Sequence, residues 1–344
     1  MTETRDRVTS TTAVKTPDTP PSFASRIPWR SIAIVVPFLV VFIFLSAFPG
    51  SNFLTPLNIT NVLDRQAGLL IVAAASTLVL IAGGLDLSVG ATYMFTAVVC
   101  GTLIVKVGGV AGAATGIVVA VLAGLLVGIV NGIISTYLRI NPLIATLAMS
   151  FILLGATKLV SQFGKEGIGQ IRVDFEEFRW LATTKPLGIS LPIWIAFVVI
   201  VVLGIVLWRT KFGRYVYAAG GNAEAARLAG IRVNVVRIAT FALAGLAAGL
   251  AGVIDLARTP SVPENDSIAT TLTFTVLAGI VVGGTSILGG EGAVWRTVLG
   301  VLFIAMLYNG FTLLKIDPLY QGIALGAIIL IAVGFDAWSR FRRR

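Results

Sequence analysis

The sequence predicts an all-α integral membrane protein with about ten transmembrane helices. Apolar residues occupy 56% of its 344 positions, and 37 glycines add to that share. Charged residues make up only 12%, against about 25% in a typical soluble domain. The apolar residues also fall into runs, most of them close to the ~20 residues that a spanning helix needs. So few charges could not cover this much apolar surface in water, which favours the membrane class.

Residues 1–30 precede the first apolar run. They are polar, rich in Thr, Ser and Pro, and carry five Lys or Arg residues. Such a composition predicts a disordered cytoplasmic tail. A secretory signal is the alternative, but the segment is long for one, and Ser46–Pro49 is a poor cleavage site.

Ten apolar runs follow and predict a transmembrane domain over residues 31–336. The basic residues 337–344 are then a cytoplasmic C-terminus. The third and eighth runs are short and flanked by glycine, so they are the weakest of the ten as full spans. In chain order the runs are Ile32–Phe48, Ala67–Ala82, Ala91–Val105, Val110–Val130, Leu143–Val160, Leu191–Trp208, Ile238–Ile254, Leu272–Val282, Val298–Leu314 and Leu319–Phe335.

The charges of the loops predict the side on which each loop lies. With the N-terminus inside and ten alternating spans, the whole net charge of +10 falls on the cytoplasmic segments, and the outer loops balance. This distribution satisfies the positive-inside rule, so the N- and C-termini are both predicted to be cytoplasmic. Because topology accounts for the positive charge, no nucleic-acid partner is expected.

The absence of some residue types from the sequence excludes several kinds of chemistry. The chain has no histidine and a single cysteine, Cys100, which excludes a Ser-His-Asp triad, a histidine-ligated zinc and an intrachain disulfide. No G-x-x-x-x-G-K-[ST] phosphate loop occurs, so the chain is not expected to hydrolyse a nucleotide in the usual way. We therefore predict no catalytic residues and no metal site.

The two halves of the chain share short sequence patterns. Asn131-Gly132 precedes Leu138–Leu143, and Asn309-Gly310 precedes the similar Leu314–Leu319. An earlier pair consists of Ala82-Gly83 with Asp86-Leu87, and Ala251-Gly252 with Asp255-Leu256. The members of each pair fall on opposite faces of the predicted topology, which is typical of the inverted 5+5 repeats of transporters. Chance similarity in an apolar chain is the alternative.

An inverted repeat would make the short third and eighth runs correspond. Short or glycine-interrupted segments at matching positions in two halves indicate a substrate path. The segment Gly83–Gly90 enters the third run, and Gly283–Gly290 leaves the eighth. Both contain polar residues that offer hydrogen bonds. Tight interhelical turns would explain the same glycines.

Two further features concern the interior of the spans. Small residues spaced four apart predict faces for close helix packing rather than functional sites; they are Gly124, Gly128 and Gly132, and Gly245 and Gly249. One ionisable residue, Lys158, falls within a predicted span, near its outer end. Because ion-driven carriers usually place acidic residues at mid-membrane, the energy for transport is expected to come from elsewhere.

The segment 209–237 has the densest cytoplasmic charge, six basic residues against the single acid Glu224. Asn222 is placed to cap a helix that starts at Ala223, and Gly230 is placed to end it. Such a short helix between two spans is either a rigid peg for a groove on a partner or a surface helix anchored by positive charge. The residues alone leave both interpretations open.

The same loop resembles a known family. Glu224-Ala225-Ala226 with Gly230 is similar to the E-A-A-x-x-x-G pattern by which permease subunits of ABC importers engage their ATPase. The surrounding sequence resembles the ribose/xylose/galactose-type sugar permeases, in family order from about residue 50 to residue 335. The segments that match are Gly84–Gly90, Asn141–Leu147, Thr210–Asn222 and Gly283–Gly290. The 30-residue tail is longer than the core of this family needs.

The resemblance implies a multi-pass permease of the bacterial inner membrane that imports a monosaccharide. It implies a homodimer of this chain, an ABC ATPase on separate polypeptides and an external sugar-binding protein. ATP and Mg²⁺ would bind to the ATPase, and no cofactor is expected on this chain. The residues expected to couple to the ATPase are Gly213, Arg214, Gly220, Gly221, Asn222, Glu224, Ala225, Ala226, Arg227 and Gly230.

A sugar path should offer hydroxyl, amide and carboxylate groups. The candidates are Asp86, Ser88, Asn131, Asn141, Thr146, Thr285, Ser286 and Asn309, each of which could equally stabilise a turn. Permeases for branched-chain amino acids or nucleosides share this architecture and are the first alternative. A secondary transporter that works without an ATPase is the second. The missing catalytic groups disfavour a membrane-embedded enzyme.

Overall fold

The computed structural model describes residues 29–48, 52–164, 171–173, 175–259, 261–262, 266–317 and 319–341. Most of the predicted N-terminal tail, and the last three residues of the predicted basic C-terminus, lie outside them. Within the described residues a long helix covers each of the ten apolar runs. These helices are α1 (Trp29–Ala47), α2 (Pro56–Ile81), α3 (Val89–Val107), α4 (Gly109–Thr136), α5 (Pro142–Gly164), α7 (Leu191–Arg209), α10 (Val233–Arg258), α11 (Asp266–Val282), α12 (Val294–Leu313) and α13 (Leu319–Phe341).

Seven of these helices are long and apolar enough to cross a membrane, namely α2, α3, α4, α5, α7, α10 and α12. The apolar parts of α1, α11 and α13 are shorter. The third apolar run, predicted to be short, forms a 19-residue helix because α3 begins at Val89, directly after a glycine-containing connection. The eighth run, α11, stays short at 17 residues.

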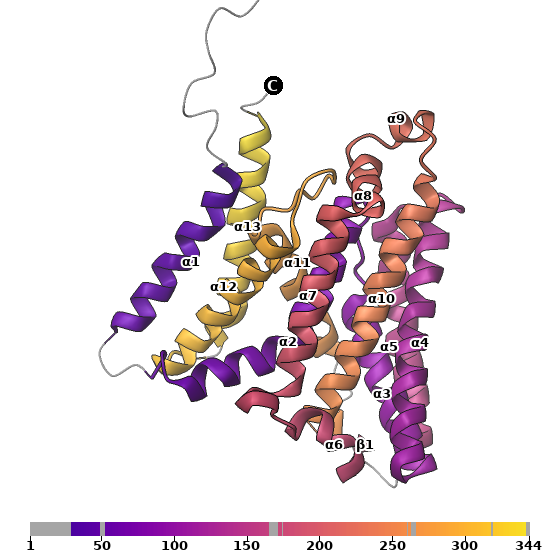
Figure 1. The fold of residues 1–344 in the computed structure, drawn as a ribbon, viewed down its shortest axis with the longest axis vertical. Helices are drawn as coiled ribbons and strands as arrows, with labels where there is room; N and C mark the ends of the chain where they lie inside the picture. The colour runs from indigo at the N-terminus through magenta and orange to yellow at the C-terminus, as the bar shows by residue number, and fades with distance from the viewer. Residues whose placement is uncertain are drawn as a thin grey trace, which may run out of the picture.

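Short elements connect the long helices at the two ends of the bundle (Figure 1). Between α7 and α10 lie α8 (Lys211–Gly221) and α9 (Ala223–Leu228). The opposite end carries α6 (Glu176–Thr183), η2 (Pro186–Gly188) and an antiparallel pair of two-residue strands, β1 (Ile171–Arg172) and β2 (Ser261–Val262). The described fold is therefore helical apart from this one small pair of strands.

Local sequence explains where the long helices begin and end. At the start of α2, the Thr55 side chain accepts a hydrogen bond from the Asn58 N–H (3.3 Å), and Pro56 occupies the first turn, where its missing N–H costs nothing. At the end of α2, Gly83 adopts a φ of +79°, which glycine accommodates freely. The N–H groups of Gly83 and Gly84 then satisfy the carbonyls of Leu80 and Val79.

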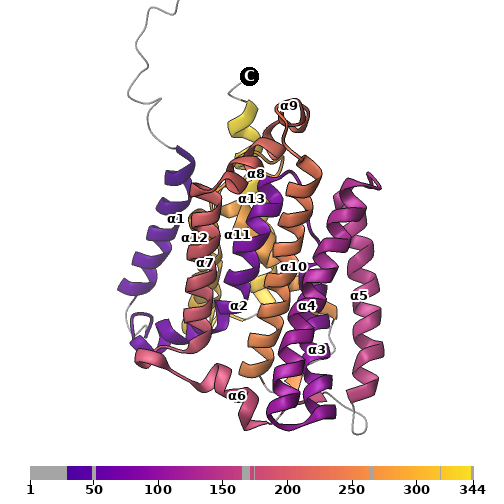
Figure 2. The ribbon, with the colours of Figure 1, turned by 45° about the vertical axis from the view of Figure 1, so that its right-hand side comes forward.

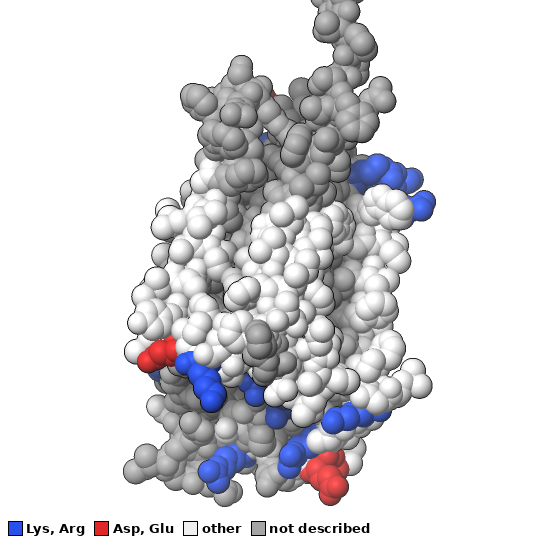
Figure 3. Space-filling model, turned by 90° about the vertical axis from the view of Figure 1, so that its left-hand side faces the viewer, with Lys and Arg blue, Asp and Glu red and all other residues white. Residues whose placement is uncertain are grey.

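The helix α10 lies inside the bundle, in contact with α2, α3 and α4. Most of the apolar part of α2, α3 and α10 is buried in the protein, whereas less than a third of the apolar part of α4, α5 and α7 is buried. Long helices that expose leucine, isoleucine and valine suit a lipid environment. Figure 3 shows one face of this surface, on which charged side chains gather near the two ends and an uncharged zone separates them.

Two turns that correspond in the predicted repeat, α4–α5 and α12–α13, lie at opposite ends of the bundle (Figures 1 and 2). The start of α1, the end of α13 and the helix α9 all lie at one end (Figures 1 and 2). The turn between α4 and α5 lies at this end too, whereas the turn between α12 and α13 lies at the other. Both turns contain a non-glycine residue of positive φ, Arg139 (55°) and Lys315 (56°). In the first turn, the Asn141 side chain accepts a 2.9 Å hydrogen bond from the Leu143 N–H. In the second, the Asp317 side chain accepts a 2.9 Å hydrogen bond from the Leu319 N–H.

Glycine allows α4 and α10 to pack backbone against backbone. A Cβ atom on Gly245 would lie 2.2 Å from the Gly124 carbonyl oxygen, and one on Gly128 would lie 2.2 Å from the Phe241 carbonyl oxygen. A Cβ atom on Gly132 would lie 2.8 Å from a Cα atom of α10. Such approaches leave no room for a side chain, which confirms the prediction that these small residues form packing faces.

Replacing Gly245 by valine should lower the stability of the fold, because the new side chain must push α10 away from α4. Overpacking of a close-packed interior typically costs about 1–3 kcal/mol. The midpoint of thermal unfolding in detergent measures the effect. Gly155→Val is the matched control, since Gly155 also lies within a helix but has no atom within 4 Å of its missing Cβ. Equal midpoints for the two variants would contradict the packing role of Gly245.

Candidate functional site

The short helix α9 is closed at both ends by its own sequence. The Asn222 side-chain oxygen accepts hydrogen bonds from the N–H groups of Glu224 (3.1 Å) and Ala225 (3.0 Å). At the other end Gly230 has a φ of +82°, and its N–H bonds to the Arg227 carbonyl (2.9 Å). These contacts confirm the predicted cap and the predicted stop. They close the first and the last turn of α9 with hydrogen bonds.

The helix α9 projects from one end of the bundle (Figures 1 and 2). Ala226 is buried toward the protein, while Glu224, Ala225 and Arg227 are exposed. Leu228 is 86% exposed and is not one of the residues that the sequence predicts for coupling. The outer side of α9 thus offers small, apolar and charged groups to a partner.

The helix α8, which leads into α9, makes close backbone contacts with the helices α7 and α2. Thr210 caps α8 by accepting a hydrogen bond from the Gly213 N–H (3.2 Å). A Cβ atom on Gly213 would lie 2.0 Å from the Leu207 carbonyl oxygen, and one on Gly220 would lie 1.7 Å from the Ile81 carbonyl oxygen. Gly213 and Gly220 therefore allow α8 to pack on the ends of α7 and α2. Two other residues expected in coupling, Arg214 and Gly221, are exposed.

Polar side chains tie α8 to the helices beside it. The Arg237 Nε, on α10, donates to the Ala82 carbonyl oxygen at the end of α2 (3.0 Å), and its Nη2 donates to the Ala219 carbonyl oxygen on α8 (3.3 Å). The Tyr217 hydroxyl donates to the Gly292 carbonyl oxygen before α12 (2.8 Å). Burial raises the pKa of Tyr217, which keeps this donor protonated at neutral pH. A displacement of α8 therefore acts on α2, α10 and α12.

Four of the predicted path residues meet where the α2–α3 connection crosses α4 and α5. The Ser88 hydroxyl donates to an Asp86 carboxylate oxygen (2.7 Å) and accepts from the Asn131 amide nitrogen (2.8 Å). The Thr146 hydroxyl accepts from the Leu87 N–H (3.0 Å). All four side chains are buried. This cluster fixes the connection between α2 and α3 by satisfying polar groups that water does not reach.

The other four predicted path residues lie apart from this cluster. Asn141 is exposed and caps the start of α5. Thr285 and Ser286 are buried in the connection between α11 and α12. Asn309 and Asn58 exchange two side-chain hydrogen bonds of 2.9 and 3.1 Å, which join α12 to α2.

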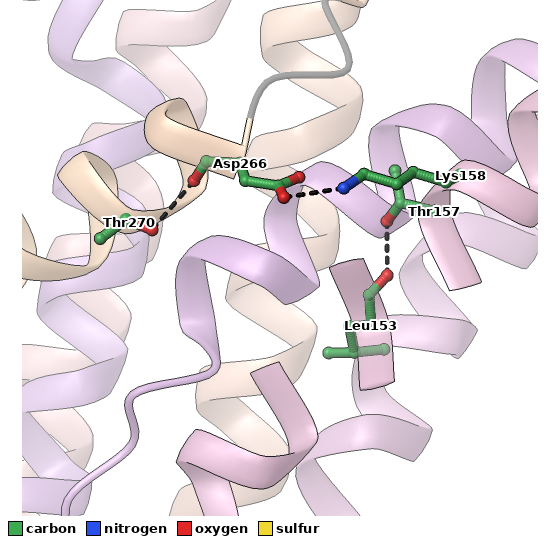
Figure 4. A network of polar contacts seen from close by, with 5 residues as sticks. All are labelled: Leu153, Thr157, Lys158, Asp266 and Thr270. Carbon is green, nitrogen blue, oxygen red and sulfur yellow. Dashed lines mark hydrogen bonds and ion pairs between the residues drawn. The ribbon is translucent and has the colours of Figure 1, made fainter. Parts of the chain in front are cut away.

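Lys158, in the second half of α5, forms an ion pair with Asp266 (Figure 4). It extends from α5 to Asp266 at the start of α11, with 2.8 Å between the Lys158 nitrogen and the carboxylate oxygen. Both side chains are about half exposed. Lys158 is thus a boundary residue with a carboxylate partner, and an exposed pair of this kind contributes only about 0–1 kcal/mol to stability.

A cavity of about 380 Å³ opens between α2, α3, α10, α11 and α12. Its polar lining consists of Arg65, Gln66, Tyr93, Asp255, Ser267, Thr271, Thr275 and Tyr308. A second cavity of about 210 Å³ shares Tyr93 and Asp255 with it. None of the eight predicted path residues lines either cavity.

Asp255 is the charged centre of this cavity. Its carboxylate accepts hydrogen bonds from the Tyr93 hydroxyl and from the Arg258 Nε, the latter at 2.9 Å. Arg258 lies one helical turn further along α10, which lets it reach the same carboxylate. The sequence marks Asp255 as a member of the predicted repeat and predicts no ligand role for it. The residues around it come from separate helices, so no local motif marks the cavity.

The described residues contain no group of three or more Cys, Asp or Glu side chains placed to hold a metal ion. The two arrangements that stand out in the described structure are the projecting helix α9 and a polar cavity. They lie at opposite ends of α10, since α10 begins beside α9 at Val233 and carries Asp255 in its last turn. A helix of 26 residues separates its ends by about 39 Å.

Comparison with known proteins gives consistent results. The profile of the family described as "Branched-chain amino acid transport system / permease component" matches residues 58–333. The ribose import permease protein RbsC of Escherichia coli K12 is 35% identical, with 87% of this chain and 91% of the relative covered. The L-arabinose ABC transporter permease protein AraH of Azospirillum brasilense is 38% identical, with 92% and 91% covered. No solved structure matches this chain.

These relatives are membrane permease subunits of ABC transporters and not enzymes themselves. The apolar helices agree with a multi-pass protein of the bacterial inner membrane. The chain belongs to the branched-chain amino acid transport system / permease component family, the membrane permeases of ABC transporters.

Proposed function

We propose that this chain is the permease subunit of an ATP-driven importer for a monosaccharide. The observation that carries the proposal is the capped helix α9, which projects from a chain of this family at the position of the E-A-A-x-x-x-G pattern. An ABC ATPase on separate polypeptides binds ATP and Mg²⁺ and docks on α9. Two copies of this chain enclose the path, and an external binding protein delivers the sugar.

The proposed topology has ten spans with both termini in the cytoplasm. The long helices over the ten apolar runs support it, as does the common position of α9 and both ends of the described chain. The net charge of +10 lies on the same side in this topology. An inverted 5+5 repeat is supported by the matching turns at Arg139 and Lys315, which lie at opposite ends of the bundle.

Transport follows from a two-state movement that the ATPase drives. Closure of the ATPase displaces α9, and α8 passes the displacement to α2 and α10 through Arg237 and the close contact at Gly220. The two conformations open the path to opposite sides, and nucleotide on the partner shifts the balance between them.

The names of the relatives favour a sugar over the alternatives. The relatives cited above are permeases for ribose and L-arabinose. The family description names branched-chain amino acids, so L-leucine is the competing substrate that a transport assay must include. A carrier that moves solute without an ATPase is the competing mechanism.

The mass of the intact complex tests the proposal. After co-expression with an ABC ATPase and purification in mild detergent, we expect two copies of this chain with two ATPase domains. Leu228→Asp should reduce the ATPase retained on purification about tenfold or more, because it places a charge in the docked surface. Leu187→Asp is the matched control, since Leu187 is 90% exposed at the end away from α9. Solute uptake by the chain alone would overturn the ATP-driven mechanism.

Gly230 tests the coupling role of α9. Gly230→Val should uncouple ATP hydrolysis from sugar uptake while leaving assembly less affected. The φ of +82° costs an L-residue about 1–2 kcal/mol, and a β-branched side chain deforms the end of α9. Gly230→Asn is the control, because asparagine enters the left-handed region more readily. Sugar taken up per ATP in vesicles is the measurement, and normal uptake by Gly230→Val would count against this role.

A further inference from the structure

We infer that, in each of the two copies that enclose the path, the 380 Å³ cavity around Asp255 is a recess in which a neutral monosaccharide rests before it enters that path. This inference rests on the proposed function and assigns its substrate site. Four properties of the cavity carry it: its place in the bundle, its size, the charge balance at Asp255 and the groups that line it.

The place of the cavity suits an entrance. Asp255 and Thr271 lie near the ends of α10 and α11 that face away from α9. In the proposed topology this is the external side, where the binding protein releases its sugar. Because α10 also begins beside α9, one rigid helix contacts both the ATPase-coupling loop and the recess.

The size of the cavity suits a small solute. Ligand sites in proteins usually enclose about 300–1,000 Å³, and this cavity lies at the lower end of that range. Such a volume accommodates a single pentose or hexose ring.

The charge balance at Asp255 favours a neutral ligand over an amino acid. Tyr93 and Arg258 both bind the Asp255 carboxylate, so its negative charge is already compensated. Among the residues that line the cavity, Asp255 is the one carboxylate and Arg65 is the other charged group. No unpaired carboxylate is therefore left for the ammonium group of an amino acid. The remaining lone pairs of the carboxylate can still accept hydrogen bonds from sugar hydroxyls.

Neutral polar groups complete the recess. Thr271 and Thr275 lie one turn apart on α11, and Gln66 faces them from α2. Tyr308 adds a hydroxyl and an aromatic face from α12. Hydroxyl and amide groups around an aromatic ring match a sugar, which presents hydroxyls at its edge and C–H groups on its face.

Protection of an introduced thiol tests the recess in the complete complex in lipid nanodiscs. Thr271→Cys places a thiol on the cavity wall, and Thr270→Cys places one on the next residue, which is also exposed but does not line the cavity. The sole natural cysteine, Cys100, is buried, so the unmodified chain serves as the blank for a polar maleimide. D-ribose, L-arabinose, D-xylose and D-galactose are the probes, and L-leucine is the competing ligand.

We expect one of the sugars to slow labelling of Thr271→Cys about tenfold at ten times its dissociation constant. Labelling of Thr270→Cys should not change. Protection of Thr271→Cys by L-leucine alone would overturn the inference. So would a complex that takes up one of these sugars while none of them protects the thiol, and that result would leave the proposed function intact. Protection of Thr271→Cys in the chain purified without its ATPase would also support the recess.

A transport measurement tests one contact of the recess. Tyr308→Phe should raise the KM for sugar uptake about five- to tenfold, because it removes one hydroxyl that bonds the ligand. Tyr320→Phe is the matched control, since Tyr320 is an exposed tyrosine on α13 outside the cavity. Equal KM values for the two variants, at equal amounts of assembled complex, would overturn the role of Tyr308.

Discussion

Close contact between helix backbones is the constraint on which the rest of this bundle depends. Hydrophobic attraction between helices is weak in lipid, so association relies on packing and hydrogen bonds. The chain meets this requirement by placing glycines of α10 against glycines of α4. Glycine is a poor helix former, and its use here shows that proximity of the backbones outweighs helix propensity. The same principle recurs where α8 lies on the ends of α2 and α7.

The position of α10 links the two functional elements. Its first turns lie beside α9 and hold Arg237, which joins α2 and α8. Its last turn carries the Asp255 and Arg258 pair. Because α10 contacts α2, α3 and α4 along its length, it cannot move without changing their packing. In the proposed mechanism, α10 therefore passes a displacement of α9 on to the cavity.

The helical parts of the fold could be predicted from the sequence because each is a local property. Apolar runs located the long helices, and Asn222 and Gly230 marked both ends of α9. The polar residues of the glycine-rich connection were predicted as a group, and the structure brings Asp86 and Ser88 together with Asn131. The cavity could not be predicted, because Tyr93, Asp255 and Tyr308 belong to three helices and become neighbours only through packing. No periodicity or motif within one helix predicts contacts of this kind between residues of different helices.

The compensated carboxylate of Asp255 has an electrical consequence. Arg258 and Tyr93 bind it inside the protein, so a neutral solute that enters the recess adds no charge and displaces none. Moving one charge across the membrane is worth about 2.3 kcal/mol per 100 mV, and a solute cycle without net charge avoids this term. The transmembrane potential therefore contributes no free energy to the uptake step. Accumulation of the solute then depends on nucleotide hydrolysis, whatever the voltage of the cell.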